Sequence, residues 1–360
     1  MNVLHLDEQR GWRGGEQQAS WLLRGLANRG HQVAVSGRPH AQFVQDPHGG
    51  VSMARLPLPF RHELDFATGR RLAHFIQDWP AHIIHAHTSH THAIACMAQR
   101  WARRGKVVVS RRIDFEPGHD PANRLKYRLP HHYIAVSERV REVLLAYGIP
   151  PQKVTRVYSS IDIARLNVAP ADRSALGVPA DAPLLVSAGA LVGHKDHATL
   201  LRAFANVRET LPEARLLIAG EGELRGELET LRAGLLLEES VQFLGHREDV
   251  PALIRVANLY VSSSWSEGLG TSVLEALGCE TPVVATVAGG VGEMVIDGQT
   301  GRLAPNRDPE ALAAAIIGAL RDPEQARTWA AHGRARVEEL FTVDRMVDGT
   351  IAVYERLLKP

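Results

Sequence analysis

The chain has 360 residues, of which 45% are hydrophobic and 22% charged, and its formal net charge is +1. This length suffices for two domains with separate cores, and the composition is typical of a globular enzyme. Two cysteines are too few for a disulfide framework or a cysteine-based metal site, and no stretch has the roughly 18 apolar residues of a membrane-spanning helix. Because the first residues do not resemble a signal peptide, the expected location is the cytoplasm.

Charge is unevenly distributed along the chain. Residues 1–165 contain 23 Lys and Arg, 13 Asp and Glu, and 14 of the 18 histidines, whereas the remainder contains 18 basic and 27 acidic residues. An excess of one sign creates a field that attracts the opposite charge. We expect the N-terminal half to meet an anionic partner, either acidic lipid headgroups at the inner face of the cell membrane or a phosphorylated glycan. The alternative is an uneven solvated surface without function.

The N-terminal half begins with a strand–loop–helix–strand pattern. Residues 3–6 are an apolar strand, residues 7–16 a loop with Gly14 and Gly15, residues 17–29 a helix, and residues 32–36 a second strand. This unit predicts a doubly wound α/β sheet. The glycine pair lacks the GxGxxG spacing of a dinucleotide fingerprint, but it follows the first strand, where open α/β sheets bind ligands.

Further candidate residues follow later strands of this half. Strands are predicted at 51–56, 82–87, 106–110, 133–136 and 154–158, with helices at 64–77, 88–103 and 138–147. In the stretch HIIHAH, His85 and His87 share one strand face, and His87 lies further out, where it can reach a substrate. His85 as a core residue, or the two as a metal pair, are the alternatives. Arg111 and Arg112 follow the next strand and are candidates to bind an anionic acceptor; otherwise they are surface charge.

The second half repeats the same strand–helix order after a weakly periodic segment, residues 159–183, that we interpret as a linker. Predicted strands are 184–188, 214–219, 241–244, 259–261 and 282–285, and residues 297–303 look like a hairpin. Predicted helices are 197–210, 249–256, 311–321, 324–340 and 342–358. Asp308 followed by Pro309 is a clear helix start.

The stretch 262–280, SSSWSEGLGTSVLEALGCE, is the one around which the chain is organised. A strand leads into a turn with Gly268 and Gly270, and a helix begins at Thr271. Free N–H groups and the helix dipole make this start a candidate phosphate site. Glu275 lies one helical turn after Thr271, and Glu267 lies before the turn, so both carboxylates can accept hydrogen bonds from sugar hydroxyls. We interpret this combination as a site for a ligand that carries both phosphates and hydroxyls, namely a nucleotide sugar.

Two α/β halves and the element SEGLGTSVLE, followed by Gly278 and TPVVAT at 281–286, resemble the retaining glycosyltransferases of family 4 over nearly the whole chain. The resemblance implies the GT-B fold, in which two Rossmann-like domains face each other across a cleft. It implies an acceptor-binding domain at 1–165, a nucleotide-sugar-binding domain at 166–340, and a C-terminal helix at 341–360 that packs back on the first domain.

The resemblance also implies roles for single residues. His87 would reach the transferred sugar, Lys195 would neutralise the diphosphate, and Glu267 would contact sugar hydroxyls. The remaining donor contacts would be Gly14 and Gly15 near the diphosphate and sugar, the amides of Gly268, Leu269, Gly270 and Thr271 on phosphate, Glu275 on ribose, and Gly220, Glu221, Gly245 and His246 around the base. The sequence departs from the family at Ala190, where an arginine is usual, so Lys195 or a group such as Arg13 would carry more of the charge.

The function implied is transfer of a sugar from a nucleoside diphosphate to a hydroxyl, with retention of configuration, in the synthesis of lipopolysaccharide or a lipid-linked envelope glycan. No Asp-x-Asp motif marks a divalent-ion site, so no metal or other cofactor is expected. The alternatives are a UDP-sugar 2-epimerase, a nicotinamide dehydrogenase, whose fingerprint is absent, and a non-catalytic sugar-binding protein. No nucleic-acid partner is expected.

Overall fold

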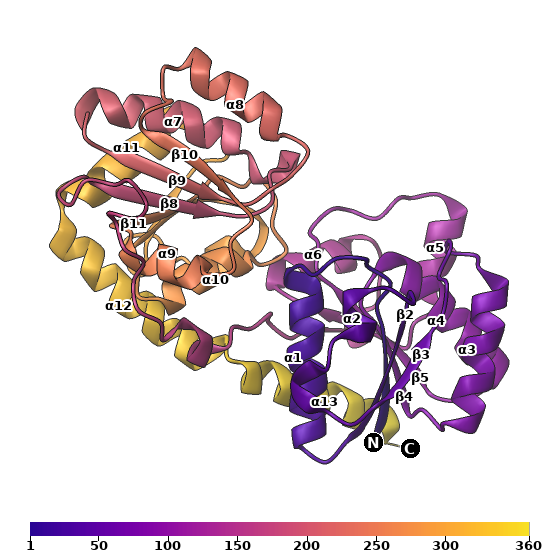
Figure 1. Cartoon of the computed structure of the whole chain (residues 1–360). Helices are drawn as coiled ribbons and strands as arrows, with labels where there is room; N and C mark the ends of the chain where they lie inside the picture. Colours follow the sequence, from indigo (N-terminus) through magenta and orange to yellow (C-terminus); the bar gives the residue numbers. More distant parts are fainter. Residues whose placement is uncertain (360) are drawn as a thin grey trace. The chain divides into compact units, whose positions relative to one another are not determined.

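In the computed structural model, which describes residues 1–359, the chain forms two compact units (Figure 1). Unit 1 consists of Met1–Ser160 and the C-terminal segment that begins at Val343, and unit 2 is Ile161–Thr342. The predicted boundaries after residues 165 and 340 are displaced from these by a few residues. The reason is that Ile161 forms a β-bridge with Thr342 and donates its backbone N–H to Phe341 O at 2.8 Å. The two points at which the chain passes from one unit to the other therefore lie side by side.

Unit 1 is built on a seven-stranded parallel sheet with the order β3-β2-β1-β4-β5-β6-β7. The strands are β1 (Asn2–Leu6), β2 (Gln32–Gly37), β3 (Ala54–Pro57), β4 (Ile83–Ala86), β5 (Lys106–Arg111), β6 (His132–Ala135) and β7 (Val154–Arg156). The helices are α1 (Gly14–Asn28), α2 (Gln42–Gln45), α3 (Phe66–Asp78), α4 (Ser89–Ala102), α5 (Pro121–Arg128), α6 (Glu138–Ala146) and α13 (Val343–Leu358).

Strand alternation decides which side chains of unit 1 meet which helix. Leu4 and Leu6 of β1 face one side of the sheet, where they join a core with Leu72 of α3 and Ile94 of α4. The opposite face, which includes His5, lies under α1 and α13. These two helices approach closely, because a Cβ added to Gly25 of α1 would lie 2.4 Å from Cγ2 of Val347 in α13.

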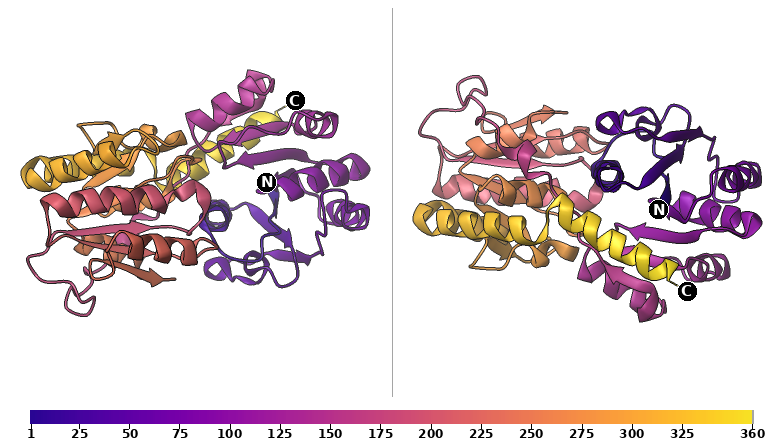
Figure 2. Two further views of the ribbon diagram at one scale, coloured as in Figure 1. Left: turned by 90° about the horizontal axis from the view of Figure 1, so that it is seen from above. Right: turned by 90° about the horizontal axis from the view of Figure 1, so that it is seen from below.

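Unit 2 is built on a six-stranded parallel sheet with the order β10-β9-β8-β11-β12-β13. The strands are β8 (Leu184–Ala188), β9 (Arg215–Ala219), β10 (Val241–Gly245), β11 (Leu259–Ser262), β12 (Val283–Thr286) and β13 (Arg302–Ala304). The helices are α7 (His197–Thr210), α8 (Arg225–Gly234), α9 (Val250–Val256), α10 (Thr271–Gly278), α11 (Pro309–Arg321) and α12 (Pro323–Leu340). Both units are therefore parallel α/β sheets with helices on their two faces, as the GT-B prediction requires (Figures 1 and 2).

Side-chain caps begin α6 and α11, the latter at Asp308, the start predicted from the sequence. Ser137 accepts a hydrogen bond from Val140 N at 3.1 Å and begins α6, and Asp308 accepts one from Ala311 N at 2.9 Å and begins α11. Because these residues satisfy N–H groups that the helix itself leaves free, they fix where each helix starts.

Two local predictions were wrong. Gly14 and Gly15 are not in a loop but are the first residues of α1, because Glu16 accepts the backbone N–H of Arg13 at 2.8 Å and starts the helix three residues earlier than predicted. Residues 297–303 do not form a hairpin. They form a turn that leads into β13, which pairs in parallel with β12, and Asp297 accepts the N–H of Leu303 at 2.9 Å.

Candidate active site

A cluster of three buried histidines lies at the carboxyl end of the unit 1 sheet. His5 of β1 stands opposite His85 of β4 in the parallel register, and His87 follows β4 directly. Nδ1 of His85 lies 2.6 Å from the hydroxyl of Tyr354 in α13, and Nε2 lies 2.8 Å from Oγ of Ser110. Since both nitrogens of His85 have partners, this side chain is a satisfied core residue, the first alternative raised from the sequence.

His87 belongs to a chain of hydrogen bonds that ends in Arg112. Nη2 of Arg112 lies 3.4 Å from Nδ1 of His87, and Nε2 of His87 lies 3.0 Å from Nδ1 of His5. A guanidinium only donates, so Nδ1 of His87 accepts and its Nε2 carries the proton. Nδ1 of His5 accepts the hydrogen bond from this Nε2–H group, and Nε2 of His5 is buried without a partner.

Burial keeps this cluster uncharged. It lowers the pKa of His5 to about 3, and it lowers the pKa values of His85 and His87 well below their usual range, with neighbouring histidines and Arg112 adding to the effect. Neutral imidazoles are metal ligands, and one nitrogen of each ring lies within 4.8 Å of the others. Because both nitrogens of His85 are hydrogen-bonded, a bound ion would have to replace one of these two bonds.

The two arginines at the end of β5, Arg111 in the strand and Arg112 directly after it, have different environments. Arg111 is buried, and its guanidinium donates to Ile113 O at 3.2 Å, to Phe115 O and to the hydroxyl of Tyr127. These bonds hold the loop after β5, so we assign Arg111 to that loop and not to the acceptor. Arg112 points to His87, and burial lowers its pKa to about 10.

Gly15 brings the start of α1 next to this cluster. A Cβ added to Gly15 would lie 3.7 Å from Cδ of Arg112. Asp7, at the end of β1, is buried, and this burial together with the charge of Glu16 raises its pKa well above the usual range, while Arg112 acts in the opposite direction. Unit 1 therefore joins Gly15, His87 and Arg112, which the sequence singled out, to two carboxyl groups that it did not.

In unit 2, the stretch after β11 has the geometry of an anion site. Gly270 caps α10 with φ +98°, a left-handed conformation that favours glycine, and no side chain caps the helix. Leu274 is the first residue of the helix whose backbone N–H donates to a carbonyl four positions earlier, that of Gly270, at 3.1 Å. The N–H groups of residues 271–273 therefore have no partner within the helix, and of the four amides predicted to bind phosphate only that of Thr271 is among them.

Lys195 and Glu267 form an ion pair beside this helix start. Nζ of Lys195 lies 2.5 Å from Oε1 of Glu267, which also accepts from Oγ of Ser264 at 2.8 Å. Nε1 of Trp265 donates to Gly193 O at 3.0 Å, and Ser263 donates to Lys195 O at 3.0 Å. The loop that carries Lys195 is thus bound to the loop that carries Glu267, and the two predicted residues are brought together.

Glu275 is largely buried on α10. Burial raises the pKa of this carboxyl to about 7, and the charge of Arg165 opposes the rise only in part. A group with this pKa changes its charge near neutral pH, so a ligand that donates hydrogen bonds to it favours the ionised form.

The loops predicted to surround the base are adjacent in unit 2. Gly220 N donates to Gly245 O at 2.8 Å, and Oε1 of Glu221 accepts from His246 N at 3.3 Å. Gly220 has φ +145°, and a Cβ there would lie 1.9 Å from Gly189 O, so only glycine allows the contact with the loop that carries Ala190.

Sequence reasoning missed His5, Ser110 and Tyr354, which complete the histidine cluster of unit 1. His5 could have been found, because a histidine inside the apolar strand NVLHL must have a polar partner once buried. Tyr354 had no such signal, since it depends on how α13 packs.

Two family models together match most of the chain. The model described as Glycosyltransferase Family 4 matches residues 12–165, and the model described as Glycosyl transferases group 1 matches residues 168–336. The chain belongs to glycosyltransferase family 4. It is accordingly a glycosyltransferase.

Curated relatives agree with this family. EpsD of Bacillus subtilis is 29% identical to this glycosyltransferase over 336 residues, 88% of this chain and 87% of EpsD. The D-inositol 3-phosphate glycosyltransferase of Mycobacterium avium is 30% identical over 235 residues, 63% of this chain and 54% of the relative. The lipopolysaccharide core biosynthesis glycosyltransferase LpsE of Rhizobium meliloti is 32% identical over 177 residues, 49% of this chain and 51% of LpsE. The last two matches thus span about half of each relative's length.

Among solved structures, HepE of Anabaena in complex with UDP and glucose has a TM-score of 0.87 and 22% identity, and the match covers 99% of this glycosyltransferase and 100% of HepE. This likeness identifies the fold as GT-B.

Proposed function

We propose that this glycosyltransferase moves a sugar from a nucleoside diphosphate to a hydroxyl group, with retention of configuration and without a resident metal ion. The observation that carries the proposal lies in unit 2, where the Lys195–Glu267 ion pair stands next to the uncapped start of α10. This arrangement offers a cation and free N–H groups to phosphate, and a carboxylate to sugar hydroxyls.

The departing group is a diphosphate, so catalysis depends on stabilising the negative charge that develops on it. In our proposal, Nζ of Lys195 and the N–H groups of residues 271–273 bind the phosphates, and Glu267 is released to accept from the sugar. The bond between the anomeric carbon and the phosphate oxygen breaks as the bond to the acceptor oxygen forms on the same face. The leaving phosphate oxygen takes the acceptor's proton. Glu267 as a covalent nucleophile is the alternative route to retention.

We assign His87 to contact with the transferred sugar, as the family resemblance implies. Of its two hydrogen bonds, the one from Arg112 to Nδ1 is the longer, at 3.4 Å against 3.0 Å for the bond to His5. A sugar hydroxyl that donates to Nδ1 would replace the weaker contact and leave the His5 bond in place. Gly14 and Gly15 allow a ligand to approach the start of α1 without a side chain in the way.

We propose a uridine diphosphate sugar as the donor, since HepE is described in complex with UDP and glucose. Glu275 would accept hydrogen bonds from the ribose hydroxyls, and the loops at 220–221 and 245–246 would border the base.

We propose an anionic acceptor in cell-envelope glycan synthesis. LpsE is named for lipopolysaccharide core biosynthesis, and the Mycobacterium relative is named for an inositol phosphate. The basic excess of the N-terminal half supports an acceptor that carries negative charge.

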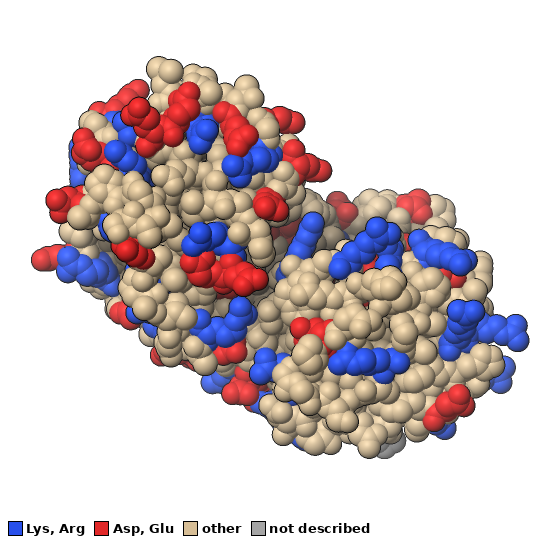
Figure 3. All heavy atoms as spheres, viewed as in Figure 1, with Lys and Arg blue, Asp and Glu red and all other residues tan. Residues whose placement is uncertain are grey.

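Contact with the inner membrane surface is supported by exposed apolar side chains of unit 1. Leu64, Phe66 and Leu125 are 63%, 62% and 61% exposed, and the ring of Phe66 lies near that of the half-exposed Trp101, with ring centroids 6.3 Å apart. Exposed arginines lie in the same segments: Arg61, Arg100, Arg103, Arg124 and Arg128. Figure 3 shows more basic than acidic groups on the face of unit 1 turned to the viewer. Apolar side chains among arginines fit a bilayer with anionic headgroups. No helix among residues 1–359 is both long and apolar enough to cross a bilayer.

The direct test screens UDP-, GDP- and ADP-sugars for thermal stabilisation of the protein, and then supplies the stabilising donor with candidate glycan acceptors. Retention is read from the anomeric configuration of the product by NMR, and independence of metal from an unchanged rate in EDTA. Release of UDP from UDP-GlcNAc with no acceptor added would favour the 2-epimerase. Sugar binding without nucleotide would favour the non-catalytic alternative.

Membrane contact is tested by vesicle flotation. We expect binding to vesicles that contain anionic lipid, loss of binding at high salt, and weakening by Phe66→Asp. Equal binding to zwitterionic vesicles, or no effect of Phe66→Asp, would contradict this part of the proposal.

A further inference from the structure

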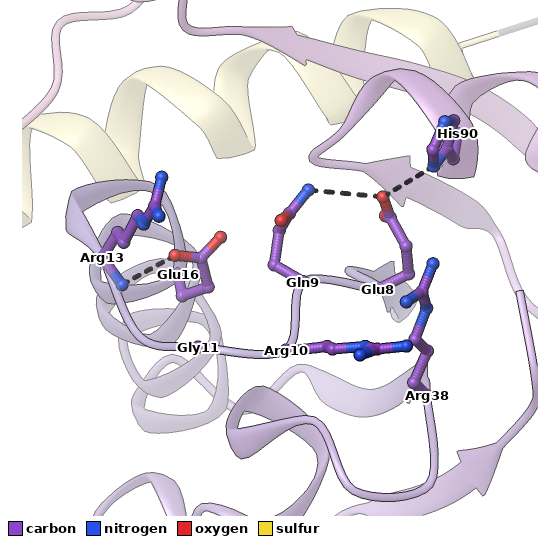
Figure 4. A pocket seen from close by; sticks show the side chains of 8 residues that line it. All are labelled: Glu8, Gln9, Arg10, Gly11, Arg13, Glu16, Arg38 and His90. Atoms are coloured by element: carbon purple, nitrogen blue, oxygen red, sulfur yellow. Dashed lines mark hydrogen bonds and ion pairs between the residues drawn. The ribbon is translucent and has the colours of Figure 1, made fainter. Parts of the chain in front are cut away.

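A cavity of about 320 Å³ opens in unit 1 beside the carboxyl end of β1. Its lining comes from the loop before α1, from Arg38 after β2 and from His90 at the start of α4 (Figure 4). Of the residues that line this cavity, only Arg13 was named from the sequence, as a possible additional cation for the diphosphate.

One wall of the cavity is a buried carboxylate. Glu8 is 3% exposed; one oxygen accepts from Oγ1 of Thr88, and the other lies 3.3 Å from Nδ1 of His90 and 3.4 Å from Nε2 of Gln9. Thr88 follows His87 in the chain, so the Glu8 carboxylate lies at the same edge of the sheet as the histidine assigned to the sugar. Carboxylate oxygens have more lone pairs than these partners use and can accept a ligand's hydroxyl.

Three arginines also line the cavity, together with a second carboxyl group, that of Glu16 in α1. Arg10, Arg13 and Arg38 form no ion pair with any of residues 1–359. Arg38 donates Nη2 to Phe60 O at 3.2 Å, while its Nε is buried without a partner. Figure 4 shows Arg13 on one side of the cavity and Arg10 with Arg38 on the other.

The arginines and the Glu8 carboxylate together indicate which chemical groups a ligand of this cavity carries. Unpaired guanidinium groups, one with a buried N–H that lacks an acceptor, favour phosphate, which they can bind in a bidentate manner. A simple polyanion would be repelled by the Glu8 carboxylate. A neutral sugar could offer hydroxyl oxygens to the Nε of Arg38, but it would leave the charge of the guanidinium groups uncompensated.

We propose that this cavity binds the acceptor, and that the acceptor is a polyol or sugar that carries a phosphate group. Its phosphate binds Arg38 and Arg10, and a hydroxyl donates to Glu8. This inference rests on the proposed function. It assigns the contact with the acceptor's negative charge to Arg10 and Arg38, from two other segments of unit 1, and not to Arg111, which holds a loop.

The test uses the full-length protein and matched pairs of small molecules: myo-inositol with D-inositol 3-phosphate, and glucose with glucose 1-phosphate. Calorimetry gives the ratio of the two dissociation constants in each pair. We expect at least one pair in which the phosphorylated member binds tenfold or more tightly. The double variant Arg10→Met/Arg38→Met should bring that ratio close to one, and Arg70→Met, at an exposed arginine of α3 outside the cavity, should leave it unchanged.

Glu8→Gln separates the two halves of the proposal. It should weaken binding of the unphosphorylated member, because an amide oxygen is a weaker acceptor for a hydroxyl than a carboxylate. It should not lower the ratio, because the phosphate contacts remain and a negative charge that repels the phosphate is removed. The inference is overturned if no pair favours its phosphorylated member, or if the double variant keeps the ratio.

Failure of this inference can be told apart from failure of the proposed function. Stabilisation by a nucleotide sugar is measured on the same preparations, and neither Arg10 nor Arg38 is among the contacts proposed for the donor. Donor stabilisation without any phosphate preference would refute the cavity's ligand alone. A phosphate preference that depends on Arg10 and Arg38, without stabilisation by any nucleotide sugar, would refute the donor assignment and leave the cavity's ligand standing.

Discussion

The Nζ atom of Lys195 and the Oε1 atom of Glu267 lie 2.5 Å apart, although 72 positions separate the residues in the chain. Their side chains are 19% and 10% exposed, so the ion pair is largely shielded from water. In the proposed function, a donor whose phosphates draw Lys195 away from this pair would leave Glu267 free for the sugar. The pair would then couple the phosphate contact to the sugar contact within unit 2.

Replacing Lys195 tests the charge that stabilises the leaving diphosphate. We expect Lys195→Ala to lower kcat by about 10²–10³-fold, the usual effect of removing one such group from an active site. Steady-state kinetics with the donor found by the thermal screen gives this value. Lys153→Ala, which removes a lysine far from the candidate residues in sequence, should leave kcat unchanged. Full activity of Lys195→Ala would remove this residue from the mechanism.

Glu275 predicts a pH dependence of nucleotide binding. Its pKa is about 7, so roughly a tenth of the groups are ionised at pH 6 and roughly nine tenths at pH 8. Ribose hydroxyls donate to the ionised form, so affinity should rise about tenfold between these pH values. Glu275→Gln, which cannot ionise, should bind more weakly at pH 8 and lose this part of the dependence. The same slope in both proteins would contradict the assignment.

The same group predicts a change in stability. Its pKa is raised from an ordinary value of 4.5, so the folded protein holds this proton more tightly than the unfolded chain. The contribution of Glu275 to stability therefore falls as the pH rises from about 4.5 to about 7 and is constant above that range. We expect Glu275→Gln to gain stability relative to the wild type across this window, measured by chemical denaturation at several pH values. A gain that is already complete at pH 4 would have another cause.

Arg112 predicts the tautomer of His87. Its guanidinium donates to Nδ1, so the proton of the neutral ring should be on Nε2 in nitrogen-15 spectra. Arg112→Met should increase the share of the other tautomer and lower kcat by about 10–100-fold, the effect expected for losing a hydrogen bond to a charged group. An unchanged tautomer with lowered kcat would mean that Arg112 acts on the substrate and not through His87.

The contact between α1 and α13 predicts a pair of compensating substitutions. Gly25→Ala places a methyl group 2.4 Å from Cγ2 of Val347, so it should destabilise unit 1 by about 1–3 kcal/mol, the usual cost of overpacking. Val347→Ala removes both atoms that are too close, so the double variant should recover most of the loss. Denaturation of the two single variants and the double variant measures the coupling. Additive effects would show that the helices can separate without cost.

The sequence by itself determined the parts of the site that are local in the chain. Gly270, Thr271 and Glu275 belong to one turn and one helix, and a helix start leaves N–H groups free wherever it lies, so their arrangement follows from spacing alone. The alternation of strands and helices likewise predicted two parallel α/β sheets, because parallel strands need crossover helices.

Only the tertiary structure decided which distant residues meet. The pairing of β1 with β4 puts His5 beside His87, and α13 brings Tyr354 to His85 across a separation of 269 positions. Charge composition predicted a basic unit 1, but burial and hydrogen bonding decide that Arg111 holds a loop while Arg38 keeps an N–H without a partner. Spacing cannot determine this, because a guanidinium is available to a ligand only after the fold has determined which carbonyls and carboxylates surround it.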